Sequence, residues 1–242
     1  MPLSVYKDRS QNKVRYSRPL EGRIRTGSFS QDAQGHWYID LTCEAEVAER
    51  EIGTRELGID LGLQEFAAFS DESIESIEAQ RFYRDLEPRL AMAQRAKKKR
   101  RTRAIHARIA NRRKDFLHKL STQIVREYGF ICIGNVNSRQ LAQTRMAKSV
   151  LDAGWRMFRN MCAYKAIAHR AYYKEQDEAF STQDCSVCDA RTGPKGLSGL
   201  GIREWICSSC GTLHQRDRNS AKIILRRGRA TLAEGITVAS GR

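Results

Sequence analysis

Two pairs of cysteines constrain this chain more than any other feature of its sequence. Cys185 and Cys188 form one CxxC pair, Cys207 and Cys210 form the other, and eighteen residues separate the two pairs. Two thiolates two residues apart can hold one ion from a tight turn, and two such turns complete a closed tetrahedron. The spacing therefore predicts a structural zinc site that has no open position for catalysis.

Other interpretations of these cysteines are pairs of reduced thiols without metal, or a redox-active CxxC. His214 is a further candidate ligand, although four cysteines already complete a tetrahedral site. The remaining cysteines, Cys43, Cys132 and Cys162, stand alone in apolar or periodic contexts. There we expect them to be small, buried, hydrophobic side chains.

The length and hydropathy of the chain limit where it can reside. Its 242 residues, 40% of them hydrophobic, are enough for one large domain or two small ones with a true core. No apolar run approaches the ~20 residues that span a bilayer. Residues 1–16 lack the apolar centre of a secretory signal. We therefore expect a cytoplasmic protein.

The charge of the chain points to a polyanionic partner. Lys and Arg number 43 against 28 Asp and Glu, a formal charge of +15. Such an excess favours nucleic acid, with a merely solvated basic surface as the alternative. A membrane-surface role is disfavoured because no long amphipathic helix with an aromatic apolar face is evident. The residues that we expect to bind nucleic acid cluster in one region: Lys97, Lys98, Lys99, Arg100, Arg101, Arg103, Arg112, Arg113 and Lys114.

The N-terminal region has the alternation of β-strands. Residues 23–30 and 37–47 predict a β-hairpin whose second arm places Trp37, Ile39 and Leu41 on one face. Two strands are not a stable domain alone, so this hairpin must pack on something or belong to a larger domain.

Strand and helix patterns alternate over the rest of the chain. The helical region at about 83–128 predicts a hairpin with one core face and one basic face. The alternation indicates an α/β class, and its order is that of an RNase H-like core. The other predicted elements are buried strands at 55–62, 66–70 and 130–133, weaker strands at 77–82 and 171–177, a helix after Met146, a short helix at 216–226, and a patternless tail from 228.

Two aspartates stand at positions where acidic residues need an explanation. Asp60 lies within an apolar strand, where a carboxylate is costly without a partner and a divalent ion would stabilise it. A turn aspartate at a strand end is the alternative. Asp217 begins a helix, where an N-cap is the ordinary role of Asp.

The acidic residues and the cysteines together form an ordered set. Residues 58–62 (GIDLG), the double CxxC and residues 216–221 (RDRNSA) resemble the C-terminal, RuvC-like half of the OrfB/TnpB family. These are transposon-encoded RNA-guided DNA endonucleases, similar to the type V CRISPR effectors. The resemblance runs from about residue 20 to residue 228. It includes residues 110–121 (ANRRKDFLHKLS), 147–155 (AKSVLDAGW) and 203–207 (REWIC).

The resemblance implies a fold and a chemistry. It implies an RNase H-like (RuvC-like) nuclease core with an inserted four-cysteine zinc ribbon, and Mg²⁺-dependent cleavage of a DNA strand with guide RNA and target DNA as partners. Asp60 and Asp217 match the family's first and third catalytic carboxylates. The implied boundaries are a β segment from a partial β-barrel at 1–54, the core at 55–184, the zinc knuckle at 185–212, the last core helix at 213–228 and a tail at 229–242.

The chain departs from the family at its second catalytic carboxylate. The family's Glu at the end of the strand 130–133 is replaced by Gly134, followed by the neutral Asn135. We expect Glu178, just after the strand 171–177, to face the vacated position and to complete the Mg²⁺ site with the two aspartates. The alternative is a surface residue that packs beside the knuckle. Asp177 is its competitor, because adjacent strand residues point to opposite faces.

The second departure is at the N-terminus, where family members carry a half-barrel and a helical recognition domain. We expect an N-terminally shortened chain whose hairpin is a barrel remnant. Three functions follow: an RNA-guided DNA endonuclease with a relocated carboxylate, a nuclease-dead RNA-guided DNA-binding protein that acts by occupancy, or a transposon remnant that binds only nucleic acid.

Overall fold

The computed structural model describes residues 5–7, 13–15, 19–44, 53–136, 147–196, 198–199 and 201–239. The chain divides into two compact units, Met1–Ala48 and Glu49–Arg242, and each is described by itself. Within the described ranges, every helix is too short or too polar to cross a membrane.

The first unit consists of two β-hairpins. Strands β1 (Val5–Lys7) and β2 (Lys13–Arg15) pair antiparallel, as do β3 (Arg23–Gln31) and β4 (Trp37–Glu44), so the predicted hairpin is confirmed. Asp32 closes the turn between β3 and β4. Its Oδ1 accepts hydrogen bonds from the backbone N–H groups of Gln34 at 2.8 Å and His36 at 2.9 Å.

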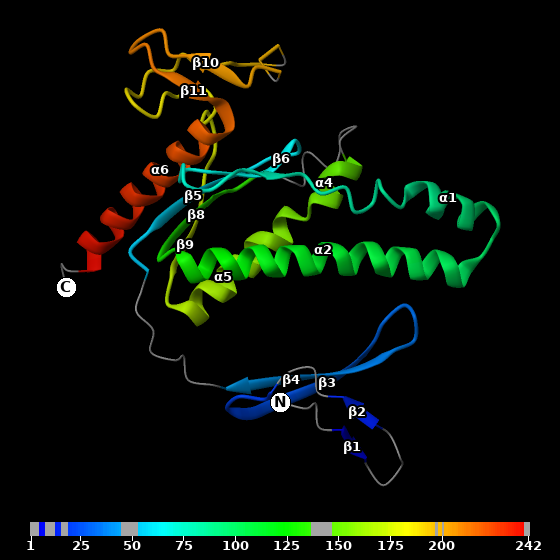
Figure 1. The fold of residues 1–242 in the computed structure, drawn as a ribbon. Coiled ribbons are helices and arrows are strands. Elements are labelled where there is room, and N and C mark those ends of the chain that lie inside the picture. Colours follow the sequence, from blue (N-terminus) through cyan, green and yellow to red (C-terminus); the bar gives the residue numbers. More distant parts are fainter. Residues whose placement is uncertain are drawn as a thin grey trace. The chain divides into compact units, whose positions relative to one another are not determined.

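The second unit is built on a five-stranded sheet in the order β7-β6-β5-β8-β9 (Figure 1). The central strands β5, β8 and β9 are parallel, whereas β6 and β7 are antiparallel to their neighbours. The strand bounds are β5 (Glu56–Leu61), β6 (Glu65–Phe69), β7 (Ile77–Glu78), β8 (Phe130–Gly134) and β9 (Tyr172–Gln176). The weak strand predicted at 77–82 is thus reduced to two residues.

The register of the parallel strands places their carboxyl ends side by side. Ile59 pairs with Ile133, and Gly134 pairs with Gln176. Asp60 therefore lies level with Gly134, and the chain after β9 begins beside both. The carboxyl ends of parallel strands are where α/β proteins form their sites.

Helices cover the two faces of this sheet. Helix α6 (Arg216–Ala239) lies on the face that carries Gly58 and Cys132, while α2 (Lys99–Glu127) and α5 (Trp155–His169) cover the other face (Figure 1). A Cβ at Gly58 would lie 2.1 Å from a carbonyl oxygen of α6, so glycine permits this close approach. Asp60 follows Gly58 by two residues and therefore belongs to the α6 face.

The predicted helical hairpin corresponds to α1 (Glu87–Arg95) and α2. Its core side includes Phe116, whose ring makes edge contacts with Phe66 and a tilted contact with Phe82. The helix predicted after Met146 is divided in two, α4 (Ala147–Ala153) and α5, because Gly154 adopts φ of +72° between them.

The prediction that the last helix ends near residue 226 and that a patternless tail follows is wrong. Helix α6 continues to Ala239. Gly228 lies within this helix. The helix passes so close to β8 at this point that a Cβ on residue 228 would lie 2.4 Å from Cys132 Sγ, and glycine avoids this clash. This glycine serves a tertiary contact and is not a helix stop.

The cysteine region adds a small ribbon to the sheet's carboxyl end. Strands β10 (Glu204–Ile206) and β11 (Leu213–Gln215) pair antiparallel, and β11 runs without a break into α6 at Arg216. The start of α6 is therefore shared by the cysteine region and the sheet.

Candidate metal centres and nucleic-acid surface

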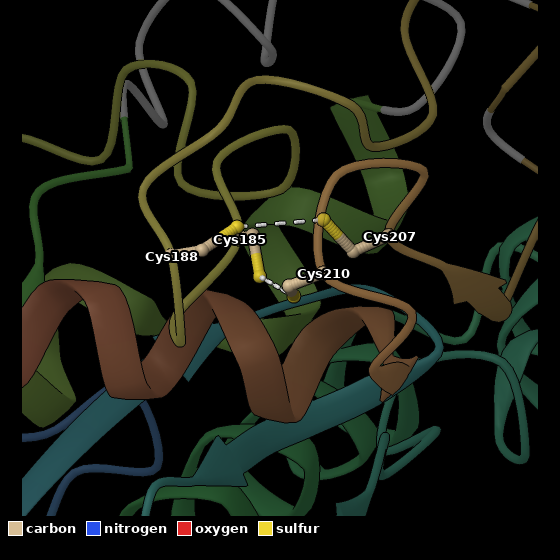
Figure 2. A group of neighbouring side chains, drawn as sticks. All are labelled: Cys185, Cys188, Cys207 and Cys210. Carbon is tan, nitrogen blue, oxygen red and sulfur yellow. Dashed lines mark hydrogen bonds between the residues drawn. The ribbon is translucent and has the colours of Figure 1, made fainter.

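The four predicted cysteine ligands converge on one point (Figure 2). Their sulfur atoms all lie within 4.8 Å of one another, with Cys185 Sγ 3.7 Å from Cys210 Sγ and Cys188 Sγ 3.6 Å from Cys207 Sγ. A tetrahedral ion with metal–sulfur bonds of ~2.3 Å requires sulfur separations of about 3.8 Å. The cluster can therefore hold one metal ion such as zinc.

Polar side chains surround the cysteine cluster. The Thr192 hydroxyl donates to Cys207 Sγ at 3.2 Å, and this hydrogen bond is the main cause that lowers the pKa of Cys207 to about 6. Burial raises the pKa of Cys185 to about 11. His214 Nε2 lies 3.0 Å from Cys185 Sγ, and its ring makes a tilted contact with the Trp205 ring, with centroids 4.7 Å apart. The histidine proposed as a competing ligand thus lies directly against one sulfur.

The acidic residues predicted for Mg²⁺ come from three elements: Asp60 from β5, Glu178 from the turn after β9, and Asp217 from the first turn of α6. The pKa of Asp60 is well above its usual value, first because of burial and then because of the negative charges of Glu178 and Asp217. Across the described residues, only the cysteines have ligand atoms all within 4.8 Å, so the three carboxylates are neighbours without converging on one point.

The Glu178 side chain lies against Gly134. A Cβ built on Gly134 would be 2.8 Å from Glu178 Oε2 and 3.5 Å from Glu178 Cβ. Burial raises the pKa of Glu178 to about 7, against the opposing charge of Arg159. Asp177 behaves differently, since it is exposed and its Oδ1 accepts a hydrogen bond from the Ala179 N–H at 3.2 Å.

Asp217 has a cationic partner that the sequence did not reveal. Arg203, at the entry to β10, donates to Asp217 Oδ2 at 2.8 Å. Both residues line a cavity of about 1040 Å³ that also includes Phe66 on β6 and the basic Arg81 and Arg84. The only sequence signal for Arg203 was its place in the segment REWIC.

Most of the predicted basic residues are exposed around the connection between α1 and α2. Arg113 is the exception, because its guanidinium donates to the backbone carbonyl of Asp152 at 2.8 Å and to its carboxylate at 2.7 Å. Arg112 is exposed and only 3.7 Å from an Asp85 oxygen. The exposed set is Lys97, Lys98, Lys99, Arg100, Arg101, Arg103, Arg112 and Lys114.

Two family models match the chain. Residues 40–145 match OrfB_IS605, described as "Probable transposase", and residues 155–224 match "Cas12f1-like, TNB domain". The second match contains the four cysteines and Asp217, whereas the first contains Asp60 and the basic helical hairpin.

Relatives and solved structures agree with these models. A Streptomyces pristinaespiralis protein named as an RNA-guided DNA endonuclease is 34% identical over 96% of this chain and 60% of its own length. One of the same name from Escherichia coli is 28% identical over 95% and 63%. The chain thus spans less than two thirds of these relatives. A Cas12f1 complex with sgRNA and target DNA shares the fold, with a TM-score of 0.53 at 13% identity, over 81% of this chain and 55% of that one.

Proposed function

The chain belongs to the OrfB/TnpB family, and we propose that it is an RNA-guided DNA endonuclease whose second catalytic carboxylate, Glu178, comes from the turn after β9. In this proposal the sheet and α6 form an RuvC-like core, with the cysteine knuckle at 185–212 inserted before α6. The names of the relatives support the activity. The position of Glu178 against Gly134 is the observation that carries the active-site proposal.

Mg²⁺ is the cation that fits this donor set, since it prefers carboxylates and retained waters. When bound, it supplies a Lewis acid that activates water and stabilises the leaving oxygen of the phosphodiester. Asp60 would hold it from β5, and Glu178 from the turn after β9, on the other side of β8. Asp217 would hold it from the first turn of α6, where Arg203 now neutralises the carboxylate. Asn135, beside Gly134, contributes at most a neutral oxygen.

The proposed substrate strand lies along the cavity that Asp217 and Arg203 line. Arg81 and Arg84 on its walls match the charge of a phosphate backbone, and Phe66 provides an apolar wall. The exposed basic residues around the connection between α1 and α2 are then available for guide RNA or the guide–target duplex. The four cysteines would hold structural zinc.

One observation favours a second candidate, a nuclease-dead protein that binds DNA through its guide. Asp217 is engaged with Arg203, and the three carboxylates do not converge on one point among the described residues. A protein of this kind would occupy its target without cutting it.

A plasmid-cleavage assay with co-purified RNA and Mg²⁺ separates the two candidates. We expect the wild type to cut a target plasmid and Glu178→Ala to bind it equally well without cutting. Asp177→Ala is the matched control, because it removes one negative charge from the exposed residue next to Glu178. This control should retain cleavage. Binding without cleavage by the wild type would instead support the nuclease-dead candidate.

A further inference from the structure

The start of α6 is fastened to the cysteine region by one buried amide. Asn219 is 2% exposed. Its Oδ1 accepts a hydrogen bond from the Ser186 N–H at 2.9 Å. Its Nδ2 donates to the carbonyl of Asp184 at 2.8 Å and to that of Ser181 at 3.3 Å. One side chain on α6 thus holds the backbone on both sides of the first metal-binding cysteine.

Ser220, the next residue on α6, connects the hydrogen bonds of Asn219 to the region of the carboxylates. The Ser220 hydroxyl is fully buried and lies 2.6 Å from the Ser181 hydroxyl. The Ser220 hydroxyl also acts on the Asp60 carboxyl group, whose pKa it lowers against the larger effect of burial. The Ser181 N–H donates to the backbone carbonyl of Glu178 at 3.0 Å. Hydrogen bonds therefore run from Ser220, next to the Asp60 carboxyl group, through Ser181 to the backbone of Glu178.

We propose that Asn219 is a positioning residue that couples metal binding at the four cysteines to the arrangement of the Asp60, Glu178 and Asp217 carboxylates. The part concerning the carboxylates rests on the proposed function. The coupling itself is a property of the fold and can be tested without any cleavage.

The physical reason is that a structural metal contributes folding energy to the loops that bind it. With metal bound, the turn at Cys185 is rigid, so the hydrogen bonds of Asn219 fix the first turn of α6 against it. Without metal the turn relaxes and Asn219 loses a fixed partner. The carboxylates of Asp217 and Glu178 then lose their fixed relative positions. Asp217 lies two residues before Asn219, and Glu178 is bonded through its backbone to Ser181, whose carbonyl Asn219 holds.

A matched pair of variants isolates this role. Asn219→Asp preserves size and the acceptor for Ser186, but it removes both donated hydrogen bonds and places a charge against two carbonyl groups. Asn160→Asp is the control, because Asn160 is an exposed residue of α5 and undergoes the same chemical change. Zinc content of each purified protein verifies that the knuckle is still loaded.

Amide hydrogen exchange of the full chain measures the coupling. Stripping zinc from the wild type with a chelator should accelerate exchange at residues 178–181 and 216–221 as well as at the cysteine loops. Zinc-loaded Asn219→Asp should already exchange about 10-fold faster at these two segments, in line with local opening, and stripping should add little. The coupling is refuted if zinc removal leaves the exchange rates of both segments unchanged in the wild type. It is also refuted if zinc removal accelerates exchange at these segments as much in Asn219→Asp as in the wild type.

Binding of Mn²⁺, followed by electron paramagnetic resonance, reports on the carboxylates separately. Asn219→Asp should bind Mn²⁺ about 10-fold more weakly or worse, the range found for residues that support metal ligands from outside the first shell. Asn160→Asp should bind as the wild type does. If Asp60→Asn and the wild type bind Mn²⁺ alike, the proposed carboxylate site is wrong, while the exchange experiment still decides the coupling.

Discussion

Replacing Gly134 with alanine should displace Glu178 and slow DNA cleavage far more than it destabilises the fold. The new Cβ would lie 2.8 Å from Glu178 Oε2 and 3.1 Å from Ile224 Cδ1, whereas ordinary contacts begin at 3.4 Å. The carboxylate oxygen must therefore move by at least about 0.6 Å. Because it is the end of a flexible side chain, we expect a stability cost of only about 1 kcal/mol, the low end for overpacking.

The effect on rate should be larger, since a misplacement of ~1 Å at an active site can cost about 100-fold. We expect Gly134→Ala to cleave at least ~10-fold more slowly than the wild type under Mg²⁺ saturation. Urea unfolding gives the stability cost, and plasmid cleavage with guide RNA gives the rate.

Double variants distinguish displacement of Glu178 from general damage. In a Glu178→Ala background, Gly134→Ala should cost less stability, because of the two contacts shorter than 3.4 Å only the one to Ile224 remains. Gly134→Glu combined with Glu178→Ala should restore part of the cleavage by returning a carboxylate to the end of β8. Cleavage by Gly134→Ala at the wild-type rate, or an equal stability cost in both backgrounds, would show that Gly134 does not position Glu178.

Four further outcomes are expected. The purified protein should contain about one zinc per chain by elemental analysis, and chelation should unfold the knuckle; reduced protein without metal would contradict this. Removing Arg100, Arg101 and Arg103 should flatten the salt dependence of nucleic-acid binding by roughly 0.7–0.9 per lost phosphate contact, and an unchanged slope would exclude these contacts. Asp152→Ala should lower the free energy of unfolding by about 3 kcal/mol, because it removes the carboxylate that neutralises the part-buried Arg113; a change below ~0.5 kcal/mol in urea unfolding would show that the pair is dispensable. Because the pKa of Glu178 is raised from 4.5 to about 7 on folding, the metal-free protein should lose roughly 3 kcal/mol of stability through this group as pH rises through that window; Glu178→Gln should make the pH slope shallower, with the raised pKa of Asp60 accounting for what remains, and an unchanged pH slope would contradict it.

The features predicted well from sequence are those encoded in local spacing. The double CxxC specifies two turns whose geometry depends on a few residues each, and the four sulfur atoms converge as expected. Buried strands were also recognisable, since β5 and β8 are short apolar runs next to glycine.

The misses come from contacts between residues far apart in the chain. Helical spacing assigned Arg113 to the basic face, but its partner Asp152 lies 39 positions away. Glycine is a residue typical of helix ends, so Gly228 was predicted to follow the last helix. In the structure its small size allows α6 to lie close to Cys132. The bond between Arg203 and Asp217 depends on how β10 pairs with β11, which no local pattern encodes.

The position of Glu178 shows the limit most clearly. Its place after a strand suggested which end of the sheet it would occupy, but adjacent residues in that turn can point in opposite directions. Asp177 instead closes the turn through the Ala179 N–H, and Glu178 turns toward Gly134. Only the backbone conformation of the turn determines which of Asp177 and Glu178 faces Gly134.

The most direct test of the relocated carboxylate is a crystal structure of the protein soaked with Mn²⁺, using anomalous scattering to locate the ions. We predict an anomalous peak coordinated by Asp60 and Glu178, close to Asp217, at the carboxyl ends of β5 and β8. A peak coordinated by Asp60 and Asp217 with Glu178 turned away, or no peak near Asp60 at saturating Mn²⁺, would contradict it.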